Sequence, residues 1–199
     1  MNIREEFVKI EEEMSNHCDF YQKNGACRYG RKCMKLHQRP KVSKTLLFAK
    51  LYDNPPLAIA LAEGQNVPDE KIEEVVQHLE TWYSEIFLEV CKYGEIREMH
   101  IVDNIGDHLI GNIFIKFATE EDARNVMENI SRRRYRGKLV MPEYSPVTDF
   151  DKGSCRKFIM GHCRRGGNCN FLHMKNIDKS LRKVLFKKMY KDRPDFYDR

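Results

Sequence analysis

The chain has 199 residues, a formal net charge of +5, 41% hydrophobic residues and 33% charged residues. This length suits one ordinary domain with small accessory modules. Because no stretch approaches 18 uncharged apolar residues, the sequence predicts no transmembrane helix and no membrane partner.

The first segment, residues 1–13, is acidic and amphipathic and has no apolar core of a secretory signal. We therefore expect the protein to stay in the cytosol or nucleus, where cysteines favour metal binding over disulfides. Six of the seven cysteines fall in two tight clusters. The seventh, Cys91, is predicted to be a small buried residue on a helix.

Residues 14–40 carry the first cluster, with the spacing C-x8-C-x5-C-x3-H. Three thiolates and one imidazole make a closed tetrahedral zinc site that leaves no position for a catalytic water. A module this short cannot fold by apolar burial alone, so the metal should supply its folding energy. The predicted ligands of this finger 1 are Cys18, Cys27, Cys33 and His37.

Residues 43–147 show a mixed pattern of helices and strands. Hydrophobic periodicity predicts a strand (44–52), a loop (53–68), a helix (69–93), two strands (95–102 and 108–117), a second helix (120–130) and a last strand (137–146). Asp69 is the expected N-cap of the long helix, and Gly94 follows its expected end. The β-α-β-β-α-β order predicts an α+β fold like that of an RNA-recognition motif.

The base-stacking positions of such a motif are altered. Its third strand normally reads K/R-G-F/Y-G/A-F-V-x-F/Y, but here Ile110 replaces the basic residue and Asn112 replaces an aromatic ring. Leu47 holds the other aromatic position, on the first strand. We therefore expect protein to cover this sheet face and RNA to bind elsewhere.

The long helix is acidic. Residues 69–103 hold ten acids against Lys71, Lys92 and Arg97, and Glu85 and Glu89 lie one turn apart on one helix face. One interpretation is an ordinary solvated face. The alternative is a docking site for a basic, aromatic peptide.

Residues 150–176 carry the second cluster, with the spacing C-x7-C-x5-C-x3-H. Two near-identical spacings in one short chain predict two zinc ions, one in each finger. The alternative is a pair of purely structural metal sites without a ligand-binding role. The predicted ligands of this finger 2 are Cys155, Cys163, Cys169 and His173.

Aromatic and basic side chains alternate between the ligands of both fingers. Rings stack on unpaired bases and cations follow the phosphate backbone, so this pattern predicts single-stranded RNA binding. One ring in each finger could instead pack behind the metal; in finger 1 this could be Phe20 or Tyr21. The candidates from composition are Phe20, Tyr21, Arg28 and Lys35 in finger 1, and Phe158, Arg164, Arg165 and Phe171 in finger 2.

Residues 177–199 are predicted to form a basic C-terminal helix, from Lys179 to Arg193, that packs against the central sheet. Its apolar face would consist of Leu181, Val184, Leu185 and Met189.

The order of finger, degenerate recognition motif and finger resembles the small subunit of the U2 snRNP auxiliary factor, over about residues 14–190. The most specific stretches are KYGEI (92–96), DNIGDHLIGN (103–112), SPVTDF (145–150) and RRGGNCNFLH (164–173). The resemblance implies a nuclear, non-catalytic splicing factor. Its fingers would bind the AG of the 3′ splice site, and its central domain would bind a tryptophan-bearing peptide of the large subunit.

The resemblance also implies roles for single residues. Phe20, Arg28, Met34 and Lys35 of finger 1 would contact RNA, with Arg165 and Phe171 of finger 2; Met34 stands where the family often has serine. The tryptophan peptide would meet Glu85, Glu89, Arg133, Arg134 and Tyr135. Tyr135 stands where phenylalanine is usual and Arg134 where tryptophan is frequent. Contacts through an Arg/Ser-rich tail are not expected.

Two other functions share parts of this pattern. A regulator of messenger-RNA turnover would share the fingers but would not require the Arg133–Tyr135 loop or the acidic helix. A nuclease would need a carboxylate cluster or a nucleophile–base pair. Asp103, Asp107 and His108 lie close together, but they are interpreted as residues of a hairpin turn.

Overall fold

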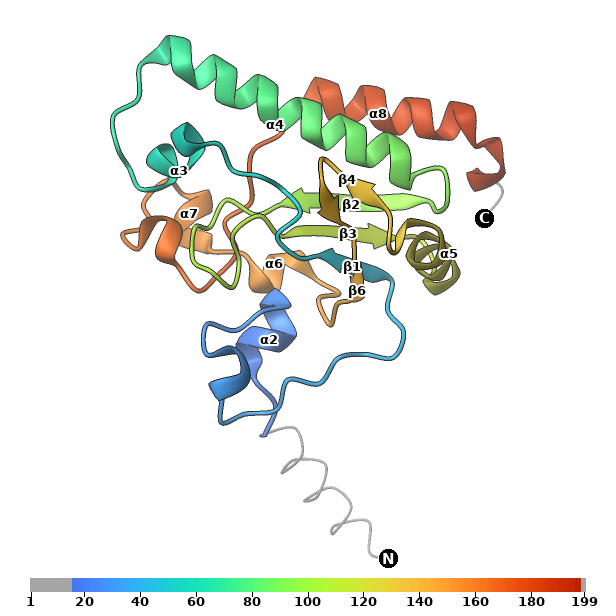
Figure 1. Ribbon diagram of the computed structural model, residues 1–199, viewed down its shortest axis with the longest axis horizontal. Coiled ribbons are helices and arrows are strands. Elements are labelled where there is room, and N and C mark those ends of the chain that lie inside the picture. Colours follow the sequence, from blue (N-terminus) through green and yellow to red (C-terminus); the bar gives the residue numbers. More distant parts are fainter. Residues whose placement is uncertain (1–15, 198–199) are drawn as a thin grey trace, which may run out of the picture.

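The computed structural model describes residues 16–197, so the acidic segment 1–13 lies outside the described residues. Four strands form an antiparallel sheet in the order β2-β3-β1-β6, and the predicted α+β fold with two flanking Cys/His clusters is confirmed (Figure 1). The elements of the central domain are β1 (Thr45–Phe48), α3 (Pro56–Ala62), α4 (Asp69–Val90), β2 (Ile96–Ile101), β3 (Ile113–Phe117), α5 (Glu120–Ile130), β4 (Arg134–Tyr135), β5 (Lys138–Leu139) and β6 (Glu143–Tyr144). The fingers and the C-terminal region contain α2 (Asp19–Asn24), η1 (Gly30–Lys32), α6 (Phe150–Gly153), α7 (Arg156–Ile159), η2 (Gly166–Asn168), α8 (Lys179–Asp192) and η3 (Pro194–Phe196).

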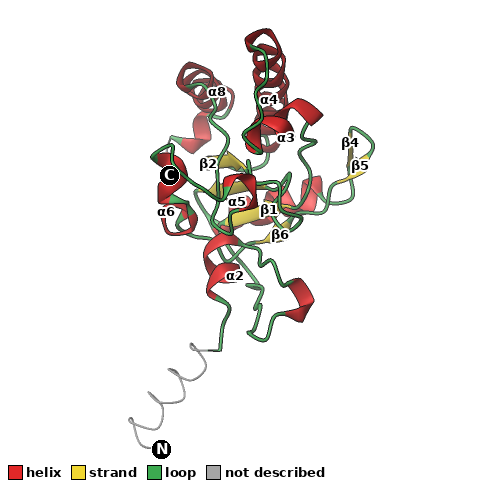
Figure 2. Ribbon diagram, turned by 90° about the vertical axis from the view of Figure 1, so that its left-hand side faces the viewer, coloured by secondary structure: helices red, strands yellow, loops and turns green. Residues whose placement is uncertain are grey.

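One face of the sheet packs against α4, α5 and α8. Alternate strand residues such as Leu46 and Ile115, which are paired between β1 and β3, point into this main core beside Trp82 and Phe87 of α4. Figure 2 shows α4 and α8 above the sheet and α2 below it. The sheet is therefore the middle layer between the long helices and finger 1.

The opposite sheet face is buried as well. Leu47 and Phe114 are paired across β1 and β3, and they form a second cluster with Val147, Phe150 and Leu172. Leu172 belongs to finger 2, so a finger covers the surface that stacks bases in an RNA-recognition motif. The expectation that protein covers this face is thus correct.

Asn112, at one altered stacking position, has a structural role. Its side chain is buried, accepts a hydrogen bond from the N–H of Lys50 at 3.0 Å and donates one to the carbonyl of His108 at 3.1 Å. These bonds satisfy one backbone group in the turn before β3 and one just after β1, so Asn112 links two segments of the fold and faces no ligand.

Several predicted boundaries are wrong. The expected loop 53–68 contains α3, because Pro55 and Pro56 begin a helix where a missing N–H costs nothing. The long helix ends at Val90 rather than at residue 93. The first strand is also shorter than predicted, and the third begins only at Ile113 because the chain turns through Gly111.

The last predicted strand, 137–146, is divided. Arg136 and Gly137 both have positive φ and make a tight turn between β4 and β5. Pro142, which cannot donate a ladder hydrogen bond, separates β5 from β6. In contrast, α5 begins and ends as predicted. Thr119 and Asp122 form a capping box that fixes its first turn.

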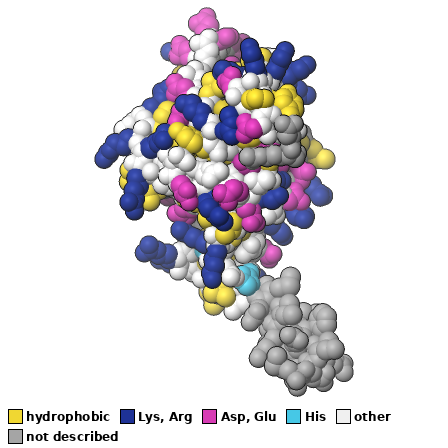
Figure 3. All heavy atoms as spheres, turned by 90° about the vertical axis from the view of Figure 1, so that its right-hand side faces the viewer, with side chains coloured by type: hydrophobic (Ala, Val, Ile, Leu, Met, Phe, Trp, Pro, Cys, Tyr) yellow, Lys and Arg dark blue, Asp and Glu magenta, His cyan; other side chains and the backbone are white. Residues whose placement is uncertain are grey.

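The C-terminal helix is present, and it lies beside α4 (Figure 1). Leu185 and Met189 are buried in the core that α4 shares with the sheet, whereas Val184 is 62% exposed and does not belong to the apolar face as predicted. Lys and Arg side chains gather around this part of the surface in Figure 3. Cys91 is buried, as expected, but it lies directly after α4 rather than within the helix. No helix within residues 16–197 is long and apolar enough to cross a membrane.

Gly111 is a position where a side chain is expected to destabilise the fold. Its φ is +70°, and an added Cβ would lie 2.4 Å from the carbonyl oxygen of Tyr52. We expect Gly111→Ala to lower the free energy of unfolding by about 3 kcal/mol, because backbone strain and a backbone clash add. Urea denaturation of the metal-loaded protein measures this loss.

Gly137 provides the matched control. Its φ is +83°, but a Cβ there would meet no atom within 4 Å. Gly137→Ala should therefore cost only about 1–2 kcal/mol from the left-handed backbone. Equal losses in the two variants would show that the contact with Tyr52 is unimportant.

Candidate metal centres, basic groove and helix pocket

Both predicted ligand sets are assembled in the fold. The ligand atoms of Cys18, Cys27, Cys33 and His37 lie within 4.8 Å of one another, and so do those of Cys155, Cys163, Cys169 and His173. In finger 2, the sulfur of Cys155 lies 3.7 Å from that of Cys163 and 3.8 Å from that of Cys169. These sulfurs are too far apart for a disulfide and close enough to share one cation. The structure thus has two sites that could hold a metal ion.

The two fingers are built in the same way. In each, the first cysteine directly precedes a short helix, and the third follows a 3-10 turn. The N–H of the first cysteine donates to the carbonyl of the residue before the ligand histidine. These bonds run from Cys18 to Leu36 and from Cys155 to Leu172, both at 2.9 Å. This bond closes each finger into a loop around its ligands.

An aromatic ring lies flat on each ligand histidine. Tyr21 stacks on His37 with centroids 4.7 Å apart, and Phe158 stacks on His173 at 4.0 Å. The Nε2 atoms of both histidines are buried without a hydrogen-bond partner. Burial lowers the pKa of His173, which favours the neutral imidazole that binds metals.

These contacts decide a point that the sequence left open. Tyr21, rather than Phe20, is the ring that packs beside the ligand histidine of finger 1. Tyr21 and Phe158 were both predicted to contact RNA, yet each has one ring face covered by its histidine. Orienting the ligand is therefore a direct structural role for both rings.

The two fingers touch. Phe20 of finger 1 meets Phe171 of finger 2 edge to face, with centroids 5.7 Å apart. The buried Asn24 donates its side-chain amide to the carbonyl of Asn170 at 2.6 Å. Residues about 150 positions apart in the sequence thus form one continuous surface.

A basic groove of about 520 Å³ adjoins this contact. Lys23 of finger 1 and Phe171 of finger 2 both line it, so both fingers contribute. Of the predicted RNA contacts, Arg164, Arg165 and Phe171 line the groove. The groove contains five further polar or charged residues that the prediction omitted: Lys152, Asp151, Ser154, Arg156 and Lys157.

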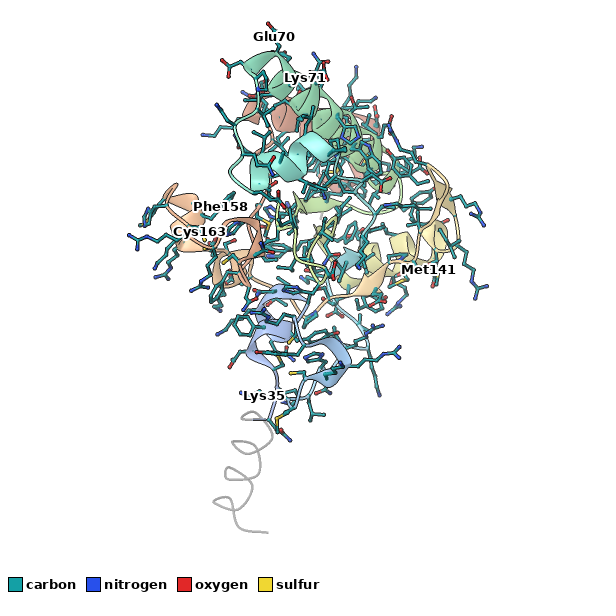
Figure 4. All side chains as sticks on the ribbon, turned by 60° about the vertical axis from the view of Figure 1, so that its left-hand side comes forward. Lys35, Glu70, Lys71, Met141, Phe158 and Cys163 are labelled. Carbon is teal, nitrogen blue, oxygen red and sulfur yellow. The ribbon has the colours of Figure 1, made fainter. Side chains whose placement is uncertain are left out.

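Other predicted RNA contacts lie elsewhere. Met34 is 99% exposed, and Figure 4 places Lys35 at the far end of finger 1, away from Phe158 and Cys163 of finger 2. The guanidinium of Arg28 lies over the ring of Tyr29, 5.9 Å from its centroid. The structure therefore does not bring these three side chains to the groove.

A separate pocket of about 310 Å³ lies between α4 and the β4–β5 hairpin. Its floor is apolar and its rim is charged. The rim contains all five predicted partner-binding residues, Glu85, Glu89, Arg133, Arg134 and Tyr135, and the floor contains Phe48, Leu51, Ile86, Val90, Ile130 and Val140.

Relatives in animals and plants match this chain over most of its length. The chain is 44% identical to the splicing factor U2AF 26 kDa subunit of Mus musculus over 170 residues, which cover 85% of this chain and 77% of that protein. It is 44% identical to the U2af 38 kDa subunit of Drosophila melanogaster, covering 85% of this chain and 65% of the relative. The chain belongs to the U2AF small-subunit family. It is 39% identical to a U2af small subunit of Arabidopsis thaliana, covering 85% of this chain and 59% of that one.

Membership in the U2AF small-subunit family confirms the resemblance inferred from the motifs and supports a role as a splicing factor, which is not an enzymatic role. No family model matches the chain. The fly and plant relatives are longer, since this chain spans less than two thirds of their length.

In this member of the U2AF small-subunit family, the two acids at the pocket, Glu85 and Glu89, do not form a freely solvated acidic face. Arg133 donates to Glu89 at 2.9 Å, and Arg136 donates to Glu85 at 3.0 Å. The hydroxyl of Tyr135 also donates to Glu85. The hydrogen bond from Tyr135 and the charge of Arg136 lower the pKa of the Glu85 carboxyl. Both acids are therefore already paired within the chain.

Sequence reasoning missed Arg136. Its guanidinium lies over the ring of Trp82, 4.8 Å from the centroid, and Trp82 meets Tyr135 edge to face at 4.9 Å. The dense run RRRYRGK at 132–138 was the available signal, since so many cations beside an acidic helix favour internal ion pairs. Arg136 thus fixes the Tyr135 wall of the pocket.

Proposed function

We propose that this chain is the RNA-binding small subunit of a nuclear splicing heterodimer. Its two fingers together bind single-stranded RNA at the AG of a 3′ splice site, and its central domain binds a tryptophan-bearing peptide of the large subunit. The observation that carries the RNA proposal is the basic groove beside the Phe20–Phe171 contact, to which both fingers contribute.

Zinc is the metal proposed for both fingers. A tetrahedral ion with bonds of about 2.3 Å to sulfur places those sulfurs about 3.8 Å apart. The distances of 3.7 and 3.8 Å from Cys155 to Cys163 and Cys169 fit this geometry. Soft thiolates with one imidazole also disfavour calcium and magnesium, which prefer oxygen ligands. The bound ion would hold each finger folded.

Bases would stack on the ring of Phe171, and phosphates would follow the cations of the groove. Arg164 and Arg165 supply positive charge beside Phe171, and Phe20 supports that ring from finger 1. Arg28, Met34 and Lys35 would contact nucleotides further along the strand, outside the groove. Tyr21 and Phe158 would act mainly by orienting His37 and His173.

The large-subunit peptide would insert its tryptophan into the pocket between α4 and the hairpin. An apolar floor with a charged rim suits a planar ring with a polar edge. Tyr135 would pack against the ring. Basic residues of the peptide would have to share Glu85 and Glu89 with Arg136 and Arg133. Arg134, which bonds the carbonyl of Gly137 at 3.1 Å, remains on the rim to contact the peptide.

RNA oligomers ending in UAG or UCG test the proposal. The metal-loaded protein should prefer UAG in fluorescence anisotropy, and a chelator should abolish that preference. Phe171→Ala should weaken UAG binding by about 1–3 kcal/mol, the usual worth of one stacked base. Equal affinity for the two oligomers would contradict the proposal.

Tyr197→Ala serves as the matched control. Tyr197 is 69% exposed and follows η3, where it packs on Tyr190 rather than on a finger. Loss of this exposed ring should leave RNA affinity unchanged.

A further inference from the structure

The central domain holds finger 2 along a short segment after β2. Val102 forms a bridge with Met174, and the N–H of Asp103 donates to the carbonyl of His173 at 2.7 Å. The N–H of Ile105 donates to the carbonyl of Gly167 at 2.9 Å. Finger 2 is thus joined to the sheet by backbone hydrogen bonds on both sides of residue 104.

Asn104 lies at the centre of this junction and is fully buried. Its amide nitrogen donates to the carbonyls of Cys169 at 2.9 Å and Phe171 at 3.0 Å. Its amide oxygen accepts from the N–H of His173 at 2.7 Å. One side chain from the central domain therefore bonds the backbone of two metal ligands and of the ring between them.

Finger 1 has no such support from the central domain among the described residues. The N–H of Leu36 donates at 2.8 Å to the carbonyl of Asn16, and finger 2 has the equivalent bond within itself, from Leu172 to Gly153 at 2.9 Å. Finger 2 therefore shares this internal bond and has the additional bonds from Asn104, whereas within residues 16–197 no hydrogen bond joins the central domain to loop 33–37 of finger 1.

We propose that Asn104 is a positioning residue, which fixes the Cys169–His173 loop so that the metal ligands and Phe171 are held in one geometry. The RNA part of this inference rests on the proposed function; the metal part does not. Only a neutral planar amide offers two donors and one acceptor from a single side-chain end, as these three backbone groups require. Groups that orient metal ligands from outside typically change metal affinity 10–100-fold when they are removed.

Asn112→Ala is the matched control for Asn104→Ala. Asn112 is also a buried asparagine of the central domain, and it also bonds backbone groups, those of Lys50 and His108. Both substitutions should destabilise the fold, because each leaves buried backbone groups unpaired. Their effects on the two fingers should differ, and thermal melting of each variant shows that it is folded.

The test is alkylation of the metal-loaded full chain with iodoacetamide, followed by mass spectrometry of each cysteine. In Asn104→Ala we expect Cys163 and Cys169 to react about tenfold faster than in the parent protein, with no change at Cys18 and Cys27. Affinity for the UAG oligomer should fall about tenfold. Asn112→Ala should show neither selective effect.

Equal acceleration in both fingers, or none, would overturn the proposal. If Asn104→Ala accelerates alkylation in finger 2 alone but leaves RNA affinity unchanged, then Asn104 does not position Phe171 for RNA. If the parent protein binds neither oligomer, the proposed RNA function is wrong, while the alkylation pattern still decides the role of Asn104 toward the metal ligands.

Discussion

Replacing Cys169 with serine is expected to remove one of the two metal ions and to abolish the preference for UAG. Cys169 is 1% exposed, and its sulfur lies 3.8 Å from that of Cys155. A serine hydroxyl does not replace a thiolate as a ligand for a soft metal site. Because a structural zinc ion supplies about 10 kcal/mol or more of folding energy to such a module, finger 2 should unfold locally.

Elemental analysis of the purified variant and anisotropy with both oligomers measure these losses. Cys91→Ser is the control, because Cys91 is also buried but lies after α4, where its thiol donates to the carbonyl of Leu88. A hydroxyl can make the same bond, so this variant should retain two metal ions. A Cys169→Ser protein with two ions and intact UAG preference would refute the assigned ligand set.

Removing the ring of Tyr135 is expected to abolish binding of a tryptophan-bearing peptide. Tyr135 forms a wall of the pocket and packs edge to face on the buried Trp82. Aromatic residues at the centre of an interface commonly contribute at least about 2 kcal/mol, so Tyr135→Ala should weaken binding about 30-fold or more. Isothermal titration of the folded variant with the peptide measures the change.

Tyr135→Phe separates the ring from its hydroxyl. This variant keeps the pocket wall and loses the hydroxyl, which donates to Glu85 and accepts from Arg136 at 3.2 Å; Arg136 still pairs with Glu85. Its affinity should stay within a few-fold of the parent value. If Tyr135→Ala binds the peptide as tightly as Tyr135→Phe does, the peptide occupies a different site.

Features encoded locally were predictable from the sequence. The ligand spacing alone identified both Cys/His clusters. In each cluster the four ligands lie within about 20 residues of sequence, so one short segment can bring all of their ligand atoms together. The helix α5 was located to the residue from its hydrophobic periodicity, and its start is also fixed locally, because Thr119 caps it through a short-range hydrogen bond. The altered stacking positions Leu47 and Asn112 correctly predicted a covered sheet face.

Features that depend on distant contacts were missed. The Phe20–Phe171 contact joins segments that no local pattern links, and Asn104 resembled an ordinary turn residue until finger 2 was seen to pack on it. Pro55 and Pro56 suggested a loop, although proline also begins helices such as α3. The pairing of Glu85 with Arg136 required the hairpin turn to fold the cation back onto α4.

The close approach of the two fingers has a consequence for biosynthesis. A Cβ on Gly153 would lie 2.3 Å from the carbonyl of Lys23, so the two segments meet backbone to backbone. During translation, finger 1 leaves the ribosome long before its counterpart, and domains fold as they emerge. The surface that both fingers share therefore exists only after the ribosome has passed residue 173, so unfinished chains lack the groove proposed to bind RNA.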